Sequence, residues 1–114
     1  MTPANYNITI YEGTNFDLAT TWLDDNDDPI DLTNWSAKMH IRNNVEDVAY
    51  IDCTPYFTLG GVAGTISLNL PSDFMVDTGY TSGVYDIDMH HTSGRVERLL
   101  LGTVTVVPEV TRTA

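Results

Sequence analysis

The chain has 114 residues, of which 42% are hydrophobic and 18% charged, which suits one folded domain and excludes a disordered or membrane-embedded composition. Its 16 acidic residues outnumber its 5 lysine and arginine residues and give a formal net charge of -11. This charge argues against binding to nucleic acid or to an anionic membrane, because both need a cationic face. We therefore expect a single domain over residues 1–114, with neither nucleic acid nor membrane as a partner.

Alternation of apolar and polar side chains predicts β-strands along most of the chain. The predicted strands cover, in chain order, residues 5–12, 16–22, 35–42, 47–53, 66–70, 83–90 and 95–107. The clearest is 35–42, where an apolar row that starts at Trp35 alternates with the polar row Ser36, Lys38, His40 and Arg42. In the last strand the run Leu99–Leu101 breaks the alternation, so we expect a bend or bulge at Gly102.

A helix is predicted at one place only. Ser72 follows Pro71 and can cap the N–H groups of residues 73–77, and Gly79 would end this helix after barely two turns. Seven strands with little helix indicate an all-β fold, an antiparallel sandwich or barrel, and the alternating apolar rows supply the two inner faces that a sandwich needs.

The ends of the chain and its single cysteine add expectations about location. The first residues lack the basic region and apolar run of a signal peptide, and no apolar stretch approaches the roughly 20 residues that cross a bilayer. Residues 1–5 and 108–114 are expected to be short extended arms. Cys53 has no cysteine partner and is expected to be a buried apolar side chain in a protein made for a reducing compartment.

The acidic loop from Asp24 to Asp31 raises the possibility of a calcium site. Asp24, Asn26 and Asp28 occupy the first, third and fifth positions of an EF-hand loop. However, Pro29 replaces the glycine of the sixth position, and Trp35 replaces the glutamate of the twelfth. The preferred interpretation is a solvated turn held by local hydrogen bonds, and a weak cation site at Asp24–Asp28 is left open.

Two other groups of side chains are candidates for catalysis. His90 and His91 are adjacent on a strand and point to opposite faces, so they do not share a ligand. Asp86 and Asp88 lie about 7 Å apart on one face, which fits a glycosidase pair but equally a polar outer surface, and nothing nearby is placed to raise either pKa. No nucleophile motif or phosphate-binding glycine loop is present. The sequence therefore predicts no catalytic, metal-binding or cofactor-binding residue and no enzyme, with a hydrolase based on the two aspartates as an alternative.

The basic residues are expected to pair with the acidic surface. Arg42 and Arg98, together with Lys38 and His40, are the candidates for a subunit interface, because arginine is enriched at binding hot spots. Trp22 and Trp35 are expected to pack in the core, and the alternative is that they stack on a sugar in a carbohydrate-binding module.

Three segments carry a resemblance to a known family. They are residues 6–16, residues 29–42 with the stretch Ile30-Asp31-Leu32-Thr33-Asn34-Trp35, and residues 83–106 with the closing stretch from Arg98 to Val106. Together they resemble small immunoglobulin-like proteins of tailed bacteriophages, in particular the N-terminal domain of phage baseplate upper proteins. Asn34 and Trp35 depart from the glycine and tyrosine that are common there.

The resemblance implies an immunoglobulin-like β-sandwich and a non-enzymatic structural protein of the virion. Such a protein would act as an adaptor of the tail, baseplate or fibre attachment through protein–protein contacts with other virion proteins. It would be present in multiple copies in a symmetric assembly and be assembled in the host cytoplasm. Capsid decoration is the alternative within this family, and the resemblance supplies no catalytic residues.

Overall fold

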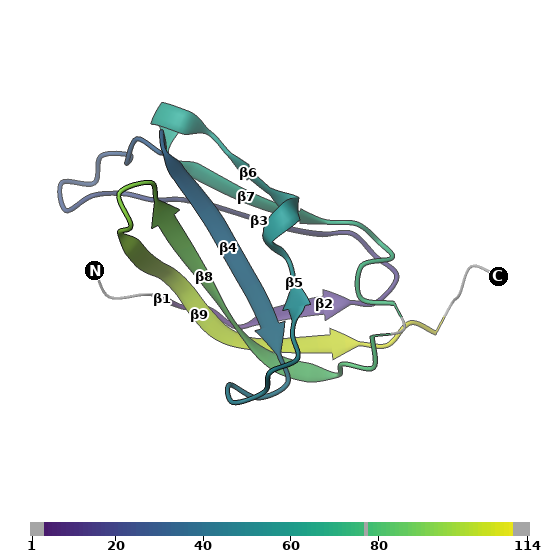
Figure 1. Cartoon of the computed structure of the whole chain (residues 1–114). Helices are drawn as coiled ribbons and strands as arrows, with labels where there is room; N and C mark the ends of the chain where they lie inside the picture. The colour runs from purple at the N-terminus through teal and green to yellow at the C-terminus, as the bar shows by residue number, and fades with distance from the viewer. Residues whose placement is uncertain (1–3, 77, 111–114) are drawn as a thin grey trace.

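The computed structural model describes residues 4–76 and 78–110 and places them in two stacked sheets (Figure 1). The larger sheet contains β1 (Ala4–Asn5), β2 (Ile8–Tyr11), β4 (Trp35–Arg42), β5 (Ile51–Asp52), β8 (Ser82–His91) and β9 (Val96–Val107). The smaller sheet contains β3 (Phe16–Thr21), β6 (Phe57–Leu59) and β7 (Thr65–Leu70). Two short 3-10 helices, η1 (Thr54–Tyr56) and η2 (Gly61–Ala63), flank β6. The predicted two-sheet sandwich is confirmed.

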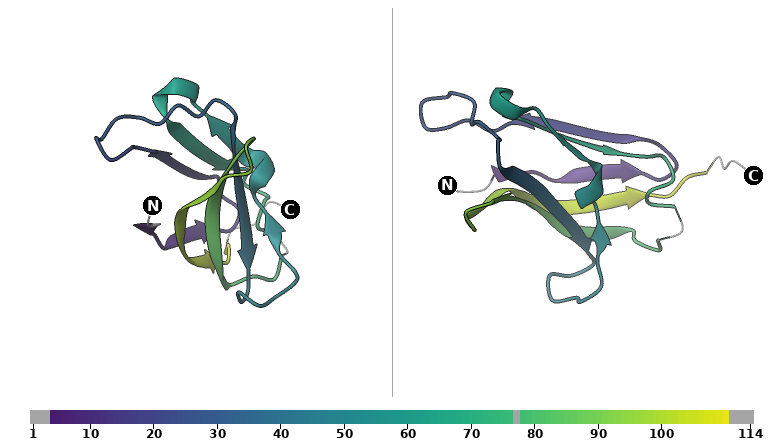
Figure 2. Two further views of the ribbon diagram at one scale, coloured as in Figure 1. Left: turned by 60° about the vertical axis from the view of Figure 1, so that its left-hand side comes forward. Right: turned by 45° about the horizontal axis from the view of Figure 1, so that its top comes forward.

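Strand order explains how the polar rows reach the surface. The larger sheet runs β1-β9-β8-β4-β5, with β2 also beside β9, and the smaller sheet runs β3-β7-β6. Figure 2 shows the two layers from two further directions. Each layer turns one side-chain row of every strand inward, so the alternate row of β4 and β8 faces away from the core.

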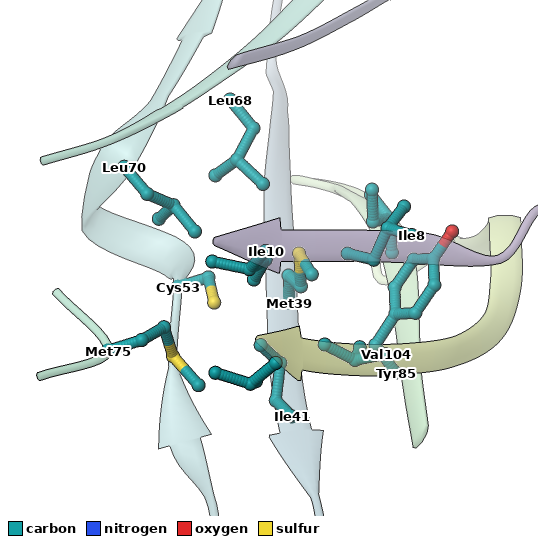
Figure 3. Close-up of a cluster of buried hydrophobic side chains, with 12 residues drawn as sticks. Ile8, Ile10, Met39, Ile41, Cys53, Leu68, Leu70, Met75, Tyr85 and Val104 are labelled. Carbon is teal, nitrogen blue, oxygen red and sulfur yellow. The ribbon is translucent and has the colours of Figure 1, made fainter. Parts of the chain in front are cut away.

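The core lies between the layers and is built from the predicted apolar rows. The buried side chains include Met39 and Ile41 of β4, Ile87 of β8 and Leu68 of β7, all at most 1% exposed. Figure 3 shows how β2, β4, β7 and β9 contribute to one cluster. Cys53 is completely buried in this cluster, as expected from the sequence.

The N-terminal strand differs from the prediction in two ways. It breaks at Tyr6–Asn7 into β1 and β2, and both pieces pair in parallel with β9, so the larger sheet is not purely antiparallel. Alternation over residues 5–12 would put Tyr6 on the same face as the buried Ile8, yet Tyr6 is 49% exposed because it lies in the break. The predicted N-terminal arm is also shorter, since the chain joins the sheet at Ala4, while residues 1–3 lie outside the described part.

The irregularity of β9 lies at Leu99 and not at Gly102. Ile87 pairs with Leu100 and Asp88 pairs with Arg98, which leaves Leu99 as the extra residue of a bulge. The bulge lets Leu99 turn inward, where it is 9% exposed and packs with the second core cluster. This placement explains how three successive leucines fit into a strand with one buried face.

The helix predicted after Pro71 is wrong for the residues that the structure describes. Residues 72–76 form successive turns, with a backbone hydrogen bond from Phe74 N–H to the carbonyl of Pro71 (3.0 Å), and residue 77 lies outside the described part. The segment before Gly79 is too short for the hydrogen bonds of a helix to offset the free-energy cost of starting one. In addition, Met75 is 2% exposed and Phe74 packs against the same core, so this segment contributes side chains to the core.

Two shorter strands were also misjudged. Only Ile51–Asp52 of the predicted strand 47–53 is a strand, and Ala49 is exposed instead of sharing a buried face with Cys53. The three-residue strand β6 was not predicted, because three residues are too short to show alternation. No helix in the described ranges is long and apolar enough to cross a bilayer.

Candidate functional site

The outward row of the larger sheet forms the surface that we call the charged face. Its ionisable side chains are Lys38, His40 and Arg42 of β4, Asp52 of β5, Asp86, Asp88 and His90 of β8, and Arg98 of β9. The strand register sets basic side chains beside acidic ones: Lys38 pairs with Asp88, His40 with Asp86, and Asp88 with Arg98. Cross-strand pairs of opposite charge stabilise a sheet, so the register itself builds an alternating network.

Arg98 is the centre of this network. Its Nε lies 2.9 Å from Oδ1 of Asp88 and 3.4 Å from Oδ2 of Asp86, and its Nη2 donates a second hydrogen bond to Asp88. Partial burial, followed by the neighbouring Asp88 carboxylate, raises the pKa of Asp86, while Arg98 opposes that rise. The hydrogen bond to Asp88 raises the pKa of Arg98 in turn. The carboxylates of Asp86 and Asp88 therefore both pair with the same guanidinium, that of Arg98.

His40 connects the network to the edge strand β5. Its Nε2 lies 3.7 Å from Oδ1 of Asp52, and its ring stacks on Tyr50 with centroids 3.9 Å apart. Hydrogen bonds from the Thr54 side chain and backbone lower the pKa of Asp52. The Thr54 hydroxyl also accepts the N–H of Met39 at 3.2 Å, which fastens η1 and β5 to β4.

Arg42 organises the loop between β4 and β5. Its Nη1 donates to the backbone carbonyls of Asp47 and Val48, and its guanidinium lies 4.9 Å above the Tyr50 ring. This anchoring leaves two apolar side chains at the loop surface, Val45 at 76% and Val48 at 90% exposure. A charged residue thus holds an apolar loop beside a charged sheet.

A pocket of about 520 Å³ opens on the charged face. It is lined by Asn5, Asn7, His40, Arg42, Val45, Val84, Tyr85, Asp86, Arg98, Leu101, Gly102 and Thr103. It brings the β4 row and the β4–β5 loop together with β8, β9 and the chain between β1 and β2.

Gly102 allows the N-terminal segment to form the wall of this pocket. A Cβ at this position would overlap the carbonyl oxygen of Tyr6 and lie 2.8 Å from its carbonyl carbon. That carbonyl accepts a hydrogen bond from the Tyr85 hydroxyl, and Asn7 Oδ1 accepts the N–H of Thr103 at 3.0 Å. Burial raises the pKa of Tyr85 to about 12, so its hydroxyl stays a donor. Because Gly102 has no side chain, the backbone of Tyr6 can lie directly against it. This close contact stands where the sequence predicted a bend or bulge.

The structure brings three of the four predicted interface residues to one pocket. His40, Arg42 and Arg98 all line it, whereas Lys38 lies on the same face opposite Asp88 and outside the pocket. Sequence reasoning missed the contributions of Asn5, Asn7 and Val45. Two exposed valines in an otherwise polar loop were the available signal for the loop.

The two aspartates considered for catalysis differ from expectation. The sequence suggested nothing to raise their pKa, but partial burial at the pocket does so for Asp86. Both carboxylates nevertheless bind Arg98, so they are held in an ion-pair network and not presented to a substrate as a free pair.

The remaining candidates have local structural partners. Asp24 Oδ1 accepts the N–H groups of Asn26 (2.8 Å) and Asp28 (3.0 Å), which confirms the local hydrogen bonds predicted for that loop. No three histidine, cysteine, aspartate or glutamate side chains gather as a metal site within residues 4–76 and 78–110. His91 bonds to the Ser93 hydroxyl, and burial raises the pKa of the Cys53 thiol to about 12, which leaves it protonated.

The two tryptophans pack on each other. Their rings meet edge to face with centroids 4.9 Å apart, and Trp35 has a similar contact with His91. Trp22 is 4% exposed, so its ring is a core aromatic as expected, while Trp35 is half-buried. The two rings therefore do not form a flat, exposed platform on which a sugar could stack.

Comparison with known proteins identifies the fold. No protein-family model matches the sequence, and the search of curated proteins gave no match. Among solved structures, the chain is similar to a chicken TCR, with a TM-score of 0.56 and 12% sequence identity over 97% of this chain. The match covers 56% of that receptor chain, so this chain spans little more than half of its length. The sandwich is therefore immunoglobulin-like, and at this identity the likeness concerns the fold alone.

Proposed function

We propose that this immunoglobulin-like domain is a non-enzymatic binding module that docks on another protein through the charged face. The single observation that supports this most is the pocket where His40, Arg42 and Arg98 meet beside the exposed Val45. Three of the chain's 5 lysine and arginine residues, Lys38, Arg42 and Arg98, belong to this face. Arginine next to exposed apolar side chains is the composition of protein–protein hot spots.

On the sequence resemblance, we place this module in the virion of a tailed bacteriophage. The preferred role is an adaptor of the tail, baseplate or fibre attachment that contacts other virion proteins in several copies. Repetition of one small contact by symmetry makes a modest interface sufficient. The support for this assignment is the likeness of residues 6–16, 29–42 and 83–106, together with an immunoglobulin-like fold.

Mass spectrometry of purified particles of the encoding phage tests the virion assignment. We expect the chain at a fixed stoichiometry to a tail protein, and its absence from the particles would contradict the proposal. A fixed ratio to the major capsid protein, with label on the head, would favour the alternative of capsid decoration.

The docking face is tested by matched variants of equally exposed valines. Val45→Asp places a charge at the pocket rim, whereas Val62→Asp places the same charge on η2 at the same 76% exposure. We expect Val45→Asp to reduce incorporation into particles about tenfold or more, since it charges a hot-spot rim, and Val62→Asp to leave incorporation unchanged. Equal incorporation of both variants would exclude this face.

A carbohydrate-binding module is the second candidate function, favoured by the half-buried Trp35. The burial of Trp22 and the edge-to-face packing of the two rings weigh against it. A glycan array in which Trp35→Ala loses a signal given by the unchanged chain would support this candidate over protein docking.

A further inference from the structure

The smaller sheet has a long open edge at β3. Within the described residues, β3 pairs with β7 only, and Figure 2 shows it at the margin of its layer. Its six residues, Phe16–Thr21, contain neither proline nor lysine, the residues that commonly protect an edge. The other margins are shorter, since β5 has two residues, β6 has three, and the first edge is split into β1 and β2.

Backbone groups of β3 point toward this open side. Trp22 N–H, just beyond β3, donates to the carbonyl of Gly64 at 2.8 Å. Because hydrogen-bonding direction alternates along an antiparallel strand, the even-numbered residues bond toward β7. The N–H and C=O groups of Asp17, Ala19 and Thr21 therefore face the open edge, where a further strand can bond to them.

The inner row of β3 is incompletely covered. Phe16 and Leu18 pack against the main core cluster but are only half-buried, in contrast to their cross-strand partners Leu70 and Leu68. A strand added beside β3 would cover them further. Constant-type immunoglobulin sandwiches place their first strand in the sheet that corresponds to β3, β7 and β6. Here the first strands pair with β9 instead, which leaves that position open.

The outer surface of the smaller sheet is nearly free of charge. Its outward row, which we call the hydroxyl face, consists of Asp17, Ala19, Thr21, Thr58, Thr65, Ser67 and Asn69. Asp17 is its one ionisable residue, and its carboxylate accepts a hydrogen bond from the Asn69 amide at 2.8 Å. In a chain of net charge -11, two copies meet with least local repulsion here.

We propose that the open edge of β3 pairs with β3 of a second copy of this chain, antiparallel about a two-fold axis near Ala19. This register sets Asp17 of each copy opposite Thr21 of the other, so no two carboxylates face each other. It joins the two smaller sheets into one continuous sheet and satisfies both open edges in a single contact. The charged face stays free on both copies, so this interface is independent of the function proposed above.

Salt dependence distinguishes this contact from docking through charges. Both copies are strongly acidic, so general repulsion opposes their approach while the β3 contact itself carries little charge. Raising NaCl from about 20 mM to about 500 mM shortens the screening length from roughly 20 Å to about 4 Å. We expect the dimer, measured by sedimentation velocity over a concentration series, to become tighter with salt.

Two variants with the same charge test the position of the axis. Ala19→Asp sets two carboxylates opposite each other across the axis, whereas Thr58→Asp adds the same charge to the hydroxyl face on β6, at the opposite margin of the sheet from β3. Like charges opposed across a strand pair oppose pairing, so Ala19→Asp should weaken self-association about tenfold or more. Thr58→Asp should associate as the unchanged chain does. Circular dichroism checks that both variants keep their strands.

Charge reversal supplies a rescue that a folding defect would not allow. Mixing Ala19→Asp with Ala19→Lys should give a heterodimer under conditions in which each variant alone stays monomeric, because the axis then pairs opposite charges. A chain that stays monomeric at every concentration and salt would overturn the proposal. Equal loss of association in Thr58→Asp, or an undiminished dimer in Ala19→Asp, would overturn it as well.

Discussion

The outer faces of the two sheets differ in how each solves the same problem of contact with water. The charged face of the larger sheet sets Asp86 and Asp88 around Arg98 and surrounds a pocket, so its side chains are fixed by one another. The hydroxyl face has small uncharged side chains and one carboxylate, so little on it is fixed beyond the backbone. We therefore expect binding by side chains at the charged face and pairing through the backbone edge at the smaller sheet.

The largest expected effect is in the core between the two sheets, where the inner side-chain rows of both sheets pack. Leu68→Ala removes a side chain with 0% exposure from the main cluster, and a loss of about 2–5 kcal/mol of unfolding free energy is expected from transfer and cavity terms. Ser67→Ala, one residue earlier on the hydroxyl face, should change stability by less than about 0.5 kcal/mol. Urea denaturation of both variants measures the contrast. Similar losses for the two would mean that the outer face is not a free surface.

The next largest effect is expected at the wall of the pocket. Gly102→Ala forces a methyl group against the backbone of Tyr6, and the N-terminal segment has to move away from β9. We expect a loss of about 1–3 kcal/mol, as for other overpacked sites, together with faster amide exchange at Tyr6, whose N–H donates to Leu101 at 2.8 Å.

The matched control for the pocket wall is Gly94→Ala. A Cβ there meets no atom within 4 Å, although the φ of 95° strains any side chain. Gly94→Ala should therefore lower stability without loosening Tyr6. Unchanged exchange at Tyr6 in Gly102→Ala would contradict the role given to this glycine.

A smaller effect is expected for the ion pairs of the charged face. Arg98→Ala leaves the neighbouring Asp86 and Asp88 carboxylates without the guanidinium that both contact. A loss of about 1 kcal/mol of unfolding free energy is expected at low salt. Arg95→Ala removes the same charge from the residue just before β9, where the Arg95 side chain is 70% exposed and pairs with Glu97. Its cost should be near zero, as for most exposed pairs. Thermal unfolding at low and high salt separates them, and equal costs would show that Arg98 has no special position.

Sequence reasoning was strongest where one face of a strand is buried. Strands β4, β7 and β8 followed directly from alternation, because burial of Met39, Leu68 and Ile87 requires a strict period of two. The same logic placed Lys38, His40, Arg42 on one outward row. It could not show that His40 and Arg98 line the same pocket, since this depends on β4, β8 and β9 being neighbours.

Errors arose where the environment outweighed the local pattern. The turns after Pro71 have a capped-helix signature, but Phe74 and Met75 insert into the core. The bulge at Leu99 shifts the register of β9, whereas Gly102 pairs regularly with Tyr85 and lies against the backbone of Tyr6, and the sequence does not distinguish these two roles. The pocket wall at Asn5 and Asn7 depends on a parallel pairing with β9 that local patterns do not encode.

The smallest expected effect concerns two aspartates of the larger sheet whose pKa values move in opposite directions. Burial raises the pKa of Asp86 above the ordinary 3.8, and hydrogen bonds from Thr54 lower that of Asp52 below it. Asp52 therefore contributes stability above pH 3.8 that is lost as the pH falls through its folded pKa. Asp86 contributes stability below pH 3.8 that is lost as the pH rises through its folded pKa.

Carboxyl titration by NMR measures both groups in one sample, and Thr54→Val isolates the cause for Asp52. Loss of the hydroxyl donor should move the pKa of Asp52 up toward 3.8 and leave Asp86 unchanged. Thr33→Val is the control, because Thr33 lowers the pKa of Asp31 by the same kind of hydrogen bond at a distant loop. This control should shift Asp31 alone. If Asp52 keeps its low pKa in Thr54→Val, the Thr54 backbone N–H, which donates to Asp52 at 3.0 Å, and the nearby His40 and Lys38 lower that pKa without help from the hydroxyl.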